Sequence, residues 1–274
     1  MTPPPKHRPG ASLGLDCRTA FQRIAHECIA EMRRRKNAAR TGDVDAIHRM
    51  RIALTKLRSA RKFFAAMTRD DSWPKLKLEI RWINSVLGAA RDSDVATGYS
   101  ASSRASRKLI KKHVTESHRL LTRALSSQRY QRLIPALAGW IDAGPWVTEQ
   151  DTDARMQRMR PLADYAKQRL AQWKKKLGSK ADKLSTERQR HLVRIDAKRF
   201  RYMSETLNIM GVRESGKQAR ARRAAARVQS ALGDLRDIRR FHRVFASPPR
   251  DRRSEQRRRA KLLREAAKSL RTLA

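Results

Sequence analysis

The chain has 274 residues, and its 65 lysines and arginines against 26 aspartates and glutamates give a formal net charge of +39. Self-repulsion of this size opposes compaction, so we expect a partner of opposite charge, such as DNA, RNA, polyphosphate or an anionic membrane. The hydrophobic fraction of 39% is low but periodic along the chain, which excludes a fully disordered polypeptide and favours a folded protein with a small core.

The first half of the chain is predicted to be a series of helices. After a proline-rich segment of residues 1–13, which we expect to be disordered, helices are predicted at 15–40, 43–68, 73–92, 101–127 and 128–142. Thr41-Gly42-Asp43 offers a helix stop followed by an N-cap, and Asp71-Ser72 before Trp73-Pro74 offers another start. No run of alternating β-branched and aromatic residues predicts a strand.

A break separates this half from the second. Ala143-Gly144-Pro145 interrupts the periodic pattern, and we expect residues 143–153 to be a polar linker. Helices are then predicted at 154–178, 186–210, 215–240 and 251–274, with Thr186 and Gln189 fitting a capping box. We therefore expect an all-α fold with two helical bundles, at 14–142 and 154–274.

The cysteines and the apolar segments bear on the compartment. Cys17 and Cys28 lie in one predicted helix, about 16 Å apart by helical rise, which is too far for a disulfide and favours a reducing compartment. The first ten residues lack the apolar core of a signal peptide. The longest apolar stretch, residues 133–141, contains Pro135 and Gly139 and is too short to span a bilayer. We expect a cytoplasmic protein that does not associate with a membrane.

One sequence pattern occurs twice. Residues 48–58 and 191–201 both contain a histidine, an arginine at +3, a basic residue at +8, an apolar residue at +9 and an arginine at +10. A Leu-Gly-x-x-Arg-Asp element follows each copy, at 87–92 and at 232–237. The two copies of each element are offset by 143 and 145 residues, which indicates an internally duplicated bundle and not a solenoid of short repeats.

On a helix, each copy forms a basic stripe with an apolar face opposite. The stripe of the first copy consists of His48, Arg51, Thr55, Arg58 and Lys62, flanked by Lys56. The stripe of the second copy consists of His191, Arg194, Lys198, Arg201 and Tyr202, flanked by Arg199. The opposite faces carry Met50, Ala53, Leu57 and Phe64 in the first copy, and Val193, Phe200 and Leu207 in the second.

The charge pattern of the stripes favours an anion-binding function over a solvated helix face. A solvated face usually mixes acidic with basic residues, yet no acidic residue occurs from His48 to Lys62. Like charges at i, i+3 and i+7 destabilise a helix, so we expect an anion to compensate them. The same spacing of like charges occurs in both copies.

These residues resemble the CHAD family, the conserved-histidine α-helical domain. The family's hallmark is a helix of the form His-x-x-Arg-(Val/Ile)-x-x-(Arg)-(Arg/Lys)-Leu-Arg, present twice and followed each time by Leu-Gly-x-x-Arg-Asp. The resemblance covers about residues 15–274. It implies two four-helix bundles related by a pseudo-twofold axis, with a basic groove or channel between them. It also implies binding of inorganic polyphosphate without hydrolysis, in some members at polyphosphate granules.

The resemblance further implies a set of ligand residues in this chain. These are His48, Arg51, Lys56, Arg58, His191, Arg194, Lys198, Arg199 and Arg201. The family's basic residue at +7 is Thr55 in the first copy and Lys198 in the second, so we expect the two halves to contribute unequally. Lys62 and Tyr202 are added to the candidate polyphosphate-binding residues because they lie on the stripes.

Arg91 and Arg236, from the Leu-Gly-x-x-Arg-Asp elements, are secondary candidates. Asp92 and Asp237 could orient these arginines toward the channel. Alternatively, each Arg-Asp pair could form a salt bridge at the end of a helix. The sequence does not decide between these two interpretations.

Two other functions remain open. Non-specific binding of a nucleic-acid backbone is supported by residues 250–264, with eight basic residues against two acidic ones, but not by the low aromatic content of 5%. A phosphoryl-transfer or phosphohistidine enzyme would need a carboxylate-held metal or a glycine-rich phosphate loop, and neither pattern occurs. We therefore expect no catalytic residues, cofactor or metal. The tryptophans are predicted to lie in the core, together with Met32, Met156, Met159, Met203 and Met210.

Overall fold

The computed structural model describes residues 14–97, 104–148, 151–245 and 252–274. The expected disorder of residues 1–13 lies outside these ranges. Within them the chain is helical and contains no strand, apart from an isolated bridge between Asp16 and Pro161. The helices are α1 (Cys17–Arg40), α2 (Val44–Phe63), α3 (Trp73–Thr97), α4 (Arg104–Ser126), α5 (Gln128–Ala143), α6 (Pro145–Thr148), α7 (Thr152–Met159), α8 (Leu162–Gly178), α9 (Glu187–Ile209), α10 (Gly216–Phe245) and α11 (Arg252–Arg271).

Two predicted helix starts are confirmed by their caps. Gly42 adopts a φ of 94°, which only glycine reaches without strain, and the Asp43 carboxylate then accepts a hydrogen bond from the Ala46 amide at 2.6 Å. Thr186 and Gln189 form the expected capping box at the start of α9. These caps set the start of the two helices that carry the histidine motifs.

Several predicted boundaries are wrong. Helix α2 ends at Phe63 and not at residue 68, and α3 continues to Thr97 and not to residue 92. Asp70, and not Asp71 or Ser72, caps α3, because its Oδ1 accepts from the Trp73 amide at 2.9 Å. The helix expected at 154–178 is divided into α7 and α8, since Pro161 has no amide hydrogen to continue the ladder. The expected linker contains the short helix α6.

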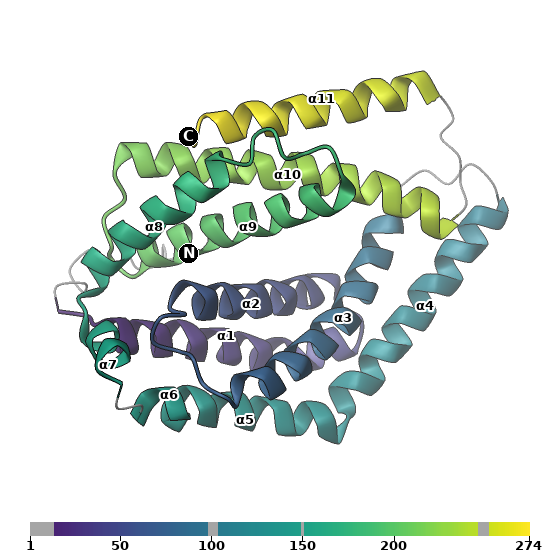
Figure 1. Ribbon diagram of the computed structural model, residues 1–274. Coiled ribbons are helices and arrows are strands. Elements are labelled where there is room, and N and C mark those ends of the chain that lie inside the picture. The colour runs from purple at the N-terminus through teal and green to yellow at the C-terminus, as the bar shows by residue number, and fades with distance from the viewer. Residues whose placement is uncertain (1–13, 98–103, 149–150, 246–251) are drawn as a thin grey trace, which may run out of the picture.

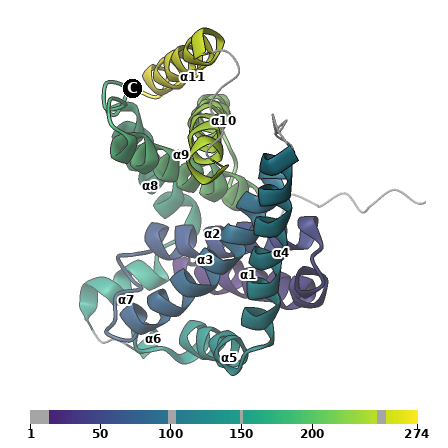
Figure 2. The same ribbon diagram turned by 90° about the vertical axis from the view of Figure 1, so that its right-hand side faces the viewer.

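The helices form two layers, and α2 of one layer faces α9 of the other. In Figure 1, α8 to α11 lie above α1, α2, α3 and α5, and α4 rises along one side toward α10. Figure 2 shows the same order from the side. Contacts between α2 and α9, and between α4 and α10, join the two layers. The faces of α2 and α9 that carry the two motifs therefore belong to one interface. The domain boundaries, the duplication and the pseudo-twofold axis stay predictions.

One hydrophobic cluster of buried residues runs from Cys17 in α1 to Leu273 after α11. An aromatic group within it joins the two layers at one end of the α2–α9 interface. The Phe64 ring stacks on Tyr165 of α8 with centroids 5.5 Å apart, and the Tyr165 hydroxyl donates to the Phe63 carbonyl at 2.6 Å. Trp173 of α8 packs edge-on against Phe63 at 5.3 Å. This packing fixes how α8, and with it α9, sits on α2.

Most of the predicted core residues are buried. Trp73, Trp140 and Trp146 are buried, and Trp82 and Trp173 pack against the core. Cys17 and Cys28 do not form a disulfide with each other, as expected, and both are buried. The prediction for Met156 and Met159 is wrong, because their side chains are 57% and 66% exposed on the short helix α7. In the part of the chain that is described, the helices are all too short or too polar to cross a membrane.

Candidate anion-binding site

Helix α2 presents the first motif as the sequence predicts. Met50, Ala53 and Leu57 are buried against the core. His48 and Lys62 are exposed on the other side, with Arg51, Thr55 and Arg58 partly exposed between them. The Thr55 hydroxyl donates to the Arg51 carbonyl within the same helix at 2.8 Å. This position of α2 therefore supplies no cation, whereas α9 has Lys198 there.

Helix α9 presents the second motif in the same manner. Val193, Phe200 and Leu207 are buried, and His191 is exposed. Tyr202 is only 5% exposed, so its ring is part of the packed layer beneath the stripe. The Lys198 Nζ lies 5.4 Å from the centre of this ring, and the Arg201 guanidinium carbon lies 4.6 Å from it. The ring thus supports two of the candidate cations from below.

The cations of the two helices lie close to one another. Burial, and then four arginines, lower the pKa of the Lys198 ammonium to about 7. These arginines are Arg51 of α2, Arg194 and Arg201 of α9, and Arg236 of α10. We call Lys198 and these four arginines the central cation cluster. It unites residues from both motifs and from the second Leu-Gly-x-x-Arg-Asp element.

The histidines flank this cluster. Partial burial and nearby cations lower the pKa of the His48 imidazole, and Lys198 from the facing helix is one of those cations. Arg91, a secondary candidate, is another of them, which places it beside His48. Burial and then Arg194 and Arg236 lower the pKa of His191. Both rings therefore favour the neutral form, as the surrounding positive charge predicts.

Asp92 is the carboxylate that connects the two layers at this site. It accepts from Arg236 at 3.1 Å, pairs with Arg240 at 2.7 Å, and lies 3.6 Å from Arg51. Its side chain is only 12% exposed. The interpretation of Arg91-Asp92 as a helix-end pair is wrong, because α3 continues to Thr97. Asp92 instead orients arginines from α2 and α10 within one cluster.

The second Leu-Gly-x-x-Arg-Asp element behaves differently. Asp237 is 3.9 Å from Arg236 within its own helix, and burial raises the pKa of its carboxyl group. Asp237 has no counterpart of the three-arginine arrangement around Asp92 among the described residues. The two halves are therefore unequal at this aspartate as well as at Thr55.

Two arginines of the cluster have buried donors that are not satisfied within the described part of the chain. The Nε atoms of Arg194 and Arg201 have no hydrogen-bond acceptor there. Neither Arg194 nor Lys198 has a carboxylate within ion-pair distance among the same residues, while Arg201 has only a long pair of 3.8 Å with Glu205. A buried donor without an acceptor costs about 1–3 kcal/mol of stability, so the cluster favours binding of a negatively charged acceptor.

A pocket of about 440 Å³ lies at the His191 end of the cluster. Its lining includes Leu232, Leu235 and Arg236 from α10, opposite His191 and Arg194 from α9. The two sequence elements that recur together thus meet at one cavity, with leucines as its apolar wall. Sequence reasoning missed three lining arginines, Arg188, Arg190 and Arg239, and also Arg240 next to Asp92. Arg239 and Arg240 follow Arg236 by about one helical turn, and this spacing is the only sequence signal that could have predicted them.

The other end of the stripes lies toward α8. Arg199 of α9 is close enough to lower the pKa of both Arg58 and Lys62, after the larger effect of burial on each. Arg199 also pairs with Asp196 at 3.1 Å, so part of its charge is neutralised. Lys62 and Arg199 line a small pocket of about 40 Å³. These residues extend the basic surface beyond the central cation cluster.

The family model for the CHAD domain matches residues 23–246 of this chain, which include both histidine motifs and both Leu-Gly-x-x-Arg-Asp elements. The chain belongs to the CHAD-domain family. The crystal structure of the CHAD domain from the plant Ricinus communis is similar to it, with a TM-score of 0.73, 25% identity and 97% of each chain covered. The CHAD fold of the described helices is thereby established.

Two curated relatives come from strains of Mycobacterium tuberculosis. They are Uncharacterized protein MT2285 of strain CDC 1551 / Oshkosh and Uncharacterized protein Rv2226 of strain ATCC 25618 / H37Rv. Each is 27% identical over 240 residues, which cover 78% of this chain and 42% of the relative. The chain thus spans less than half the length of these relatives.

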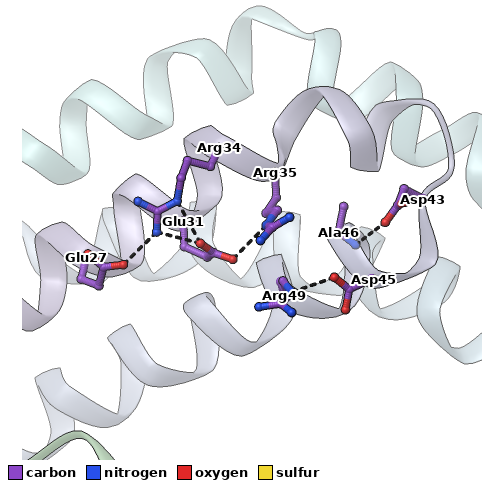
Figure 3. Close-up of polar contacts among 8 residues, drawn as sticks. All are labelled: Glu27, Glu31, Arg34, Arg35, Asp43, Asp45, Ala46 and Arg49. Carbon is purple, nitrogen blue, oxygen red and sulfur yellow. Dashed lines mark hydrogen bonds and ion pairs between the residues drawn. The ribbon is translucent and has the colours of Figure 1, made fainter. Parts of the chain in front are cut away.

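Several arginines outside the site of this CHAD domain are neutralised by local acids. On the outer side of the α1–α2 hairpin, Arg34 pairs with Glu27 at 2.8 Å and with Glu31 at 2.7 Å, and Arg49 pairs with Asp45 at 2.7 Å (Figure 3). Such pairs occur where arginine stabilises a helix surface. The α2 stripe differs, because its cations face α9 and not acids of their own helix.

Of the candidate residues, the structure brings Arg51, Arg194, Lys198, Arg201 and Arg236 together, with His48, His191 and Arg91 beside them. Arg58, Lys62 and Arg199 form the end toward α8. Lys56 lies apart, on the side of α2 toward α1, where its charge acts on the buried thiol of Cys28. The role of each of these residues in binding stays a prediction.

Proposed function

We propose that this CHAD domain binds inorganic polyphosphate, without hydrolysing it, along the facing surfaces of α2 and α9. The observation that carries the proposal is the convergence of cations from both motifs on one interface. Burial lowers the pKa of Lys198 of α9, and Arg51 of α2 is close enough to lower it further. Like charges held this close repel one another, and a bound ligand of high negative charge density compensates this repulsion.

Polyphosphate suits this surface by its chemistry. It is a thin, linear chain with roughly one negative charge per phosphate and no bases, so recognition must rest on charge density and geometry. Arginine guanidinium groups form bidentate contacts with phosphate oxygens, and lysine adds a compact charge. The unsatisfied Nε donors of Arg194 and Arg201 suit phosphate oxygens as acceptors.

The acidic residues of the site support binding rather than catalysis. Asp92 is engaged by three arginines, Asp237 lies beside Arg236, and Glu205 lies beside Arg201. In these positions the carboxylates orient guanidinium groups. A cytoplasmic location and association with polyphosphate granules belong to the same proposal, since a domain with this surface would be retained on a polyphosphate-rich phase.

The test is a titration with polyphosphates of defined length at several salt concentrations. The variant replaces Arg51, Arg58, Arg194 and Arg201 with alanine. The control replaces Arg34, Arg35, Arg119 and Arg129, which form exposed ion pairs elsewhere, and it changes the net charge equally.

If the wild type neutralises about six to ten phosphates, raising the salt concentration from 50 to 200 mM should lower its affinity about 10³- to 10⁵-fold, by analogy with counterion release from DNA. The site variant should lose most of its affinity and most of this salt dependence, and the control should keep both. Equal losses in the two variants would show that only net charge matters. Unchanged binding by the site variant would place the ligand elsewhere.

A further inference from the structure

Helix α11 carries a second basic stripe, outside the site described above. The stripe consists of Arg253, Arg257, Lys261, Arg264, Lys268 and Arg271, and all of these residues are exposed. They follow one another at intervals of three or four residues, which places them on one side of the helix. From Arg253 to Arg271 the stripe spans about 27 Å at the helical rise.

The side of α11 opposite the stripe holds the helix on the fold. Ala266, Ser269 and Leu270 are buried there, and α11 contacts α10 and α8. Glu255 lies on the other side of the axis, whereas the exposed Glu265 borders the stripe next to Lys261 and Lys268 without lying within it. Glu255 lies 3.5 Å from Arg259, away from the stripe. The cations therefore form a continuous outward surface, whose last member, Arg271, also lies 3.4 Å from Asp182.

This surface is separate from the α2–α9 interface. In Figures 1 and 2, α11 lies at the outer edge of the upper layer, with α10 between it and α9. Arg227 of α10 is exposed, and its Nε donates to the Ser269 hydroxyl at 3.4 Å, on the side of α11 that packs against the fold. A ligand held between α2 and α9 does not neutralise these charges.

The arrangement of the cations differs from that of the central cation cluster. Neighbouring like charges one turn apart repel one another and weaken a helix, so the stripe also favours an anionic partner. Its cations are exposed on a convex, straight helix, whereas those of α2 and α9 are partly buried and face one another. A convex helix touches a thin, flexible chain on one side only. It can lie along a wide, rigid polyanion whose phosphates form a fixed array.

We propose that the α11 stripe binds the backbone of a nucleic-acid duplex, independently of the α2–α9 site. Double-stranded DNA presents one charge per about 1.7 Å of its axis, so about 27 Å of helix faces many phosphates. Single-strand binding sites add aromatic rings on which bases stack, and α11 contains no aromatic residue. Contacts from arginine and lysine to phosphates alone give binding without sequence preference.

The experiment measures binding of a 24-base-pair DNA duplex, the single strand of equal length and a long polyphosphate, by anisotropy and competition over a salt series. The stripe variant replaces Arg257, Lys261, Arg264 and Lys268 with glutamine, and a milder variant replaces only Lys261 and Arg264. The control replaces Arg34, Arg35, Arg119 and Arg129 with glutamine. Because the stripe residues are exposed, the thermal midpoint should not fall in the variants.

The stripe variant should bind the duplex at least about tenfold more weakly, and its slope of log K against log salt should be shallower by about three to four. The milder variant should lose about two from this slope, and the control should lose none. Polyphosphate binding by the stripe variant should stay within about twofold of wild type. The Arg51/Arg58/Arg194/Arg201 variant should show the opposite selectivity, which keeps failure of this proposal distinct from failure of the polyphosphate proposal.

Three results would overturn the proposal. One is duplex binding by the stripe variant that equals that of the control. Another is stronger binding of the single strand than of the duplex by wild type. The third is loss of polyphosphate binding, but not of duplex binding, in the stripe variant, because the stripe would then be part of a polyphosphate site.

Discussion

Replacing Lys198 with arginine should remove much of the pH dependence of polyphosphate binding. Lys198 lies among Arg51, Arg194, Arg201 and Arg236 and over the Tyr202 ring, with burial and these arginines lowering its pKa to about 7. An ordinary lysine has a pKa of about 10.4, so only this environment makes the residue titrate near neutral pH. Arginine at the same position stays charged throughout this range.

The sign and size follow from proton linkage. With a pKa of about 7, Lys198 in the free protein is about nine-tenths protonated at pH 6 and about one-tenth protonated at pH 8. A bound polyanion favours the charged form, so binding takes up a proton, and affinity is greatest below pH 7 and falls as the pH rises through about 7. Lys198 alone should therefore make binding about tenfold tighter at pH 6 than at pH 8.

The assay is isothermal titration calorimetry with a long polyphosphate at pH 6, 7 and 8, in pairs of buffers with different ionisation enthalpies. Wild type should show proton uptake at pH 8 that decreases toward pH 6. Lys198→Arg should retain affinity at pH 8 and lose the Lys198 part of the pH dependence. The control is Lys112→Arg, on the exposed surface of α4, which should behave as wild type. An equal pH ratio in wild type and Lys198→Arg would refute the reasoning.

Three further changes test other parts of the structure. Asp92→Asn leaves three arginines without their carboxylate and should lower the free energy of unfolding by about 2 kcal/mol, or the thermal midpoint by roughly 4–8 °C. The control Asp45→Asn, at an exposed ion pair, should change the free energy of unfolding by less than about 0.5 kcal/mol. Equal shifts in the two variants would mean that Asp92 does not join the layers. The His48→Ala and His191→Ala double variant should lose the part of the affinity increase that lies at lower pH than the Lys198 step near pH 7, since burial and nearby cations lower the pKa values of both imidazoles. An unchanged pH profile in calorimetry would remove the histidines from the binding mechanism. Lys198→Met removes a buried charge that the ligand would otherwise compensate. It should therefore raise the thermal midpoint of the free protein at pH 6 by a few degrees and weaken polyphosphate binding about tenfold or more. A lowered midpoint would contradict the crowding of cations around Lys198.

Local signals allowed the sequence to predict the helices that carry the site. The Gly42-Asp43 turn and the Thr186 capping box act over a few residues, so their effect can be predicted without knowledge of the fold. The alternation of buried and exposed residues in α2 and α9 follows directly from helical periodicity. For this reason both motif stripes were predicted correctly as exposed or half-buried surfaces, with the exception of the buried Tyr202.

Tertiary packing decided the features that the sequence did not predict. Nothing near Asp92 in the chain indicates that it contacts Arg236 and Arg240, which are more than 140 residues away and on another layer. Helix α3 continues past residue 92 to Thr97, and Asp92 lies within it, paired with arginines of the other layer. Met156 and Met159 resemble core residues in sequence, but the short helix α7 leaves them exposed.

The most direct test of polyphosphate binding is a crystal structure of this chain with a polyphosphate of defined length. Phosphate density should run between α2 and α9, with oxygens within hydrogen-bond distance of Arg51, Arg194 and Lys198. Density along the exposed face of α11, with none between α2 and α9, would contradict the assignment of the site.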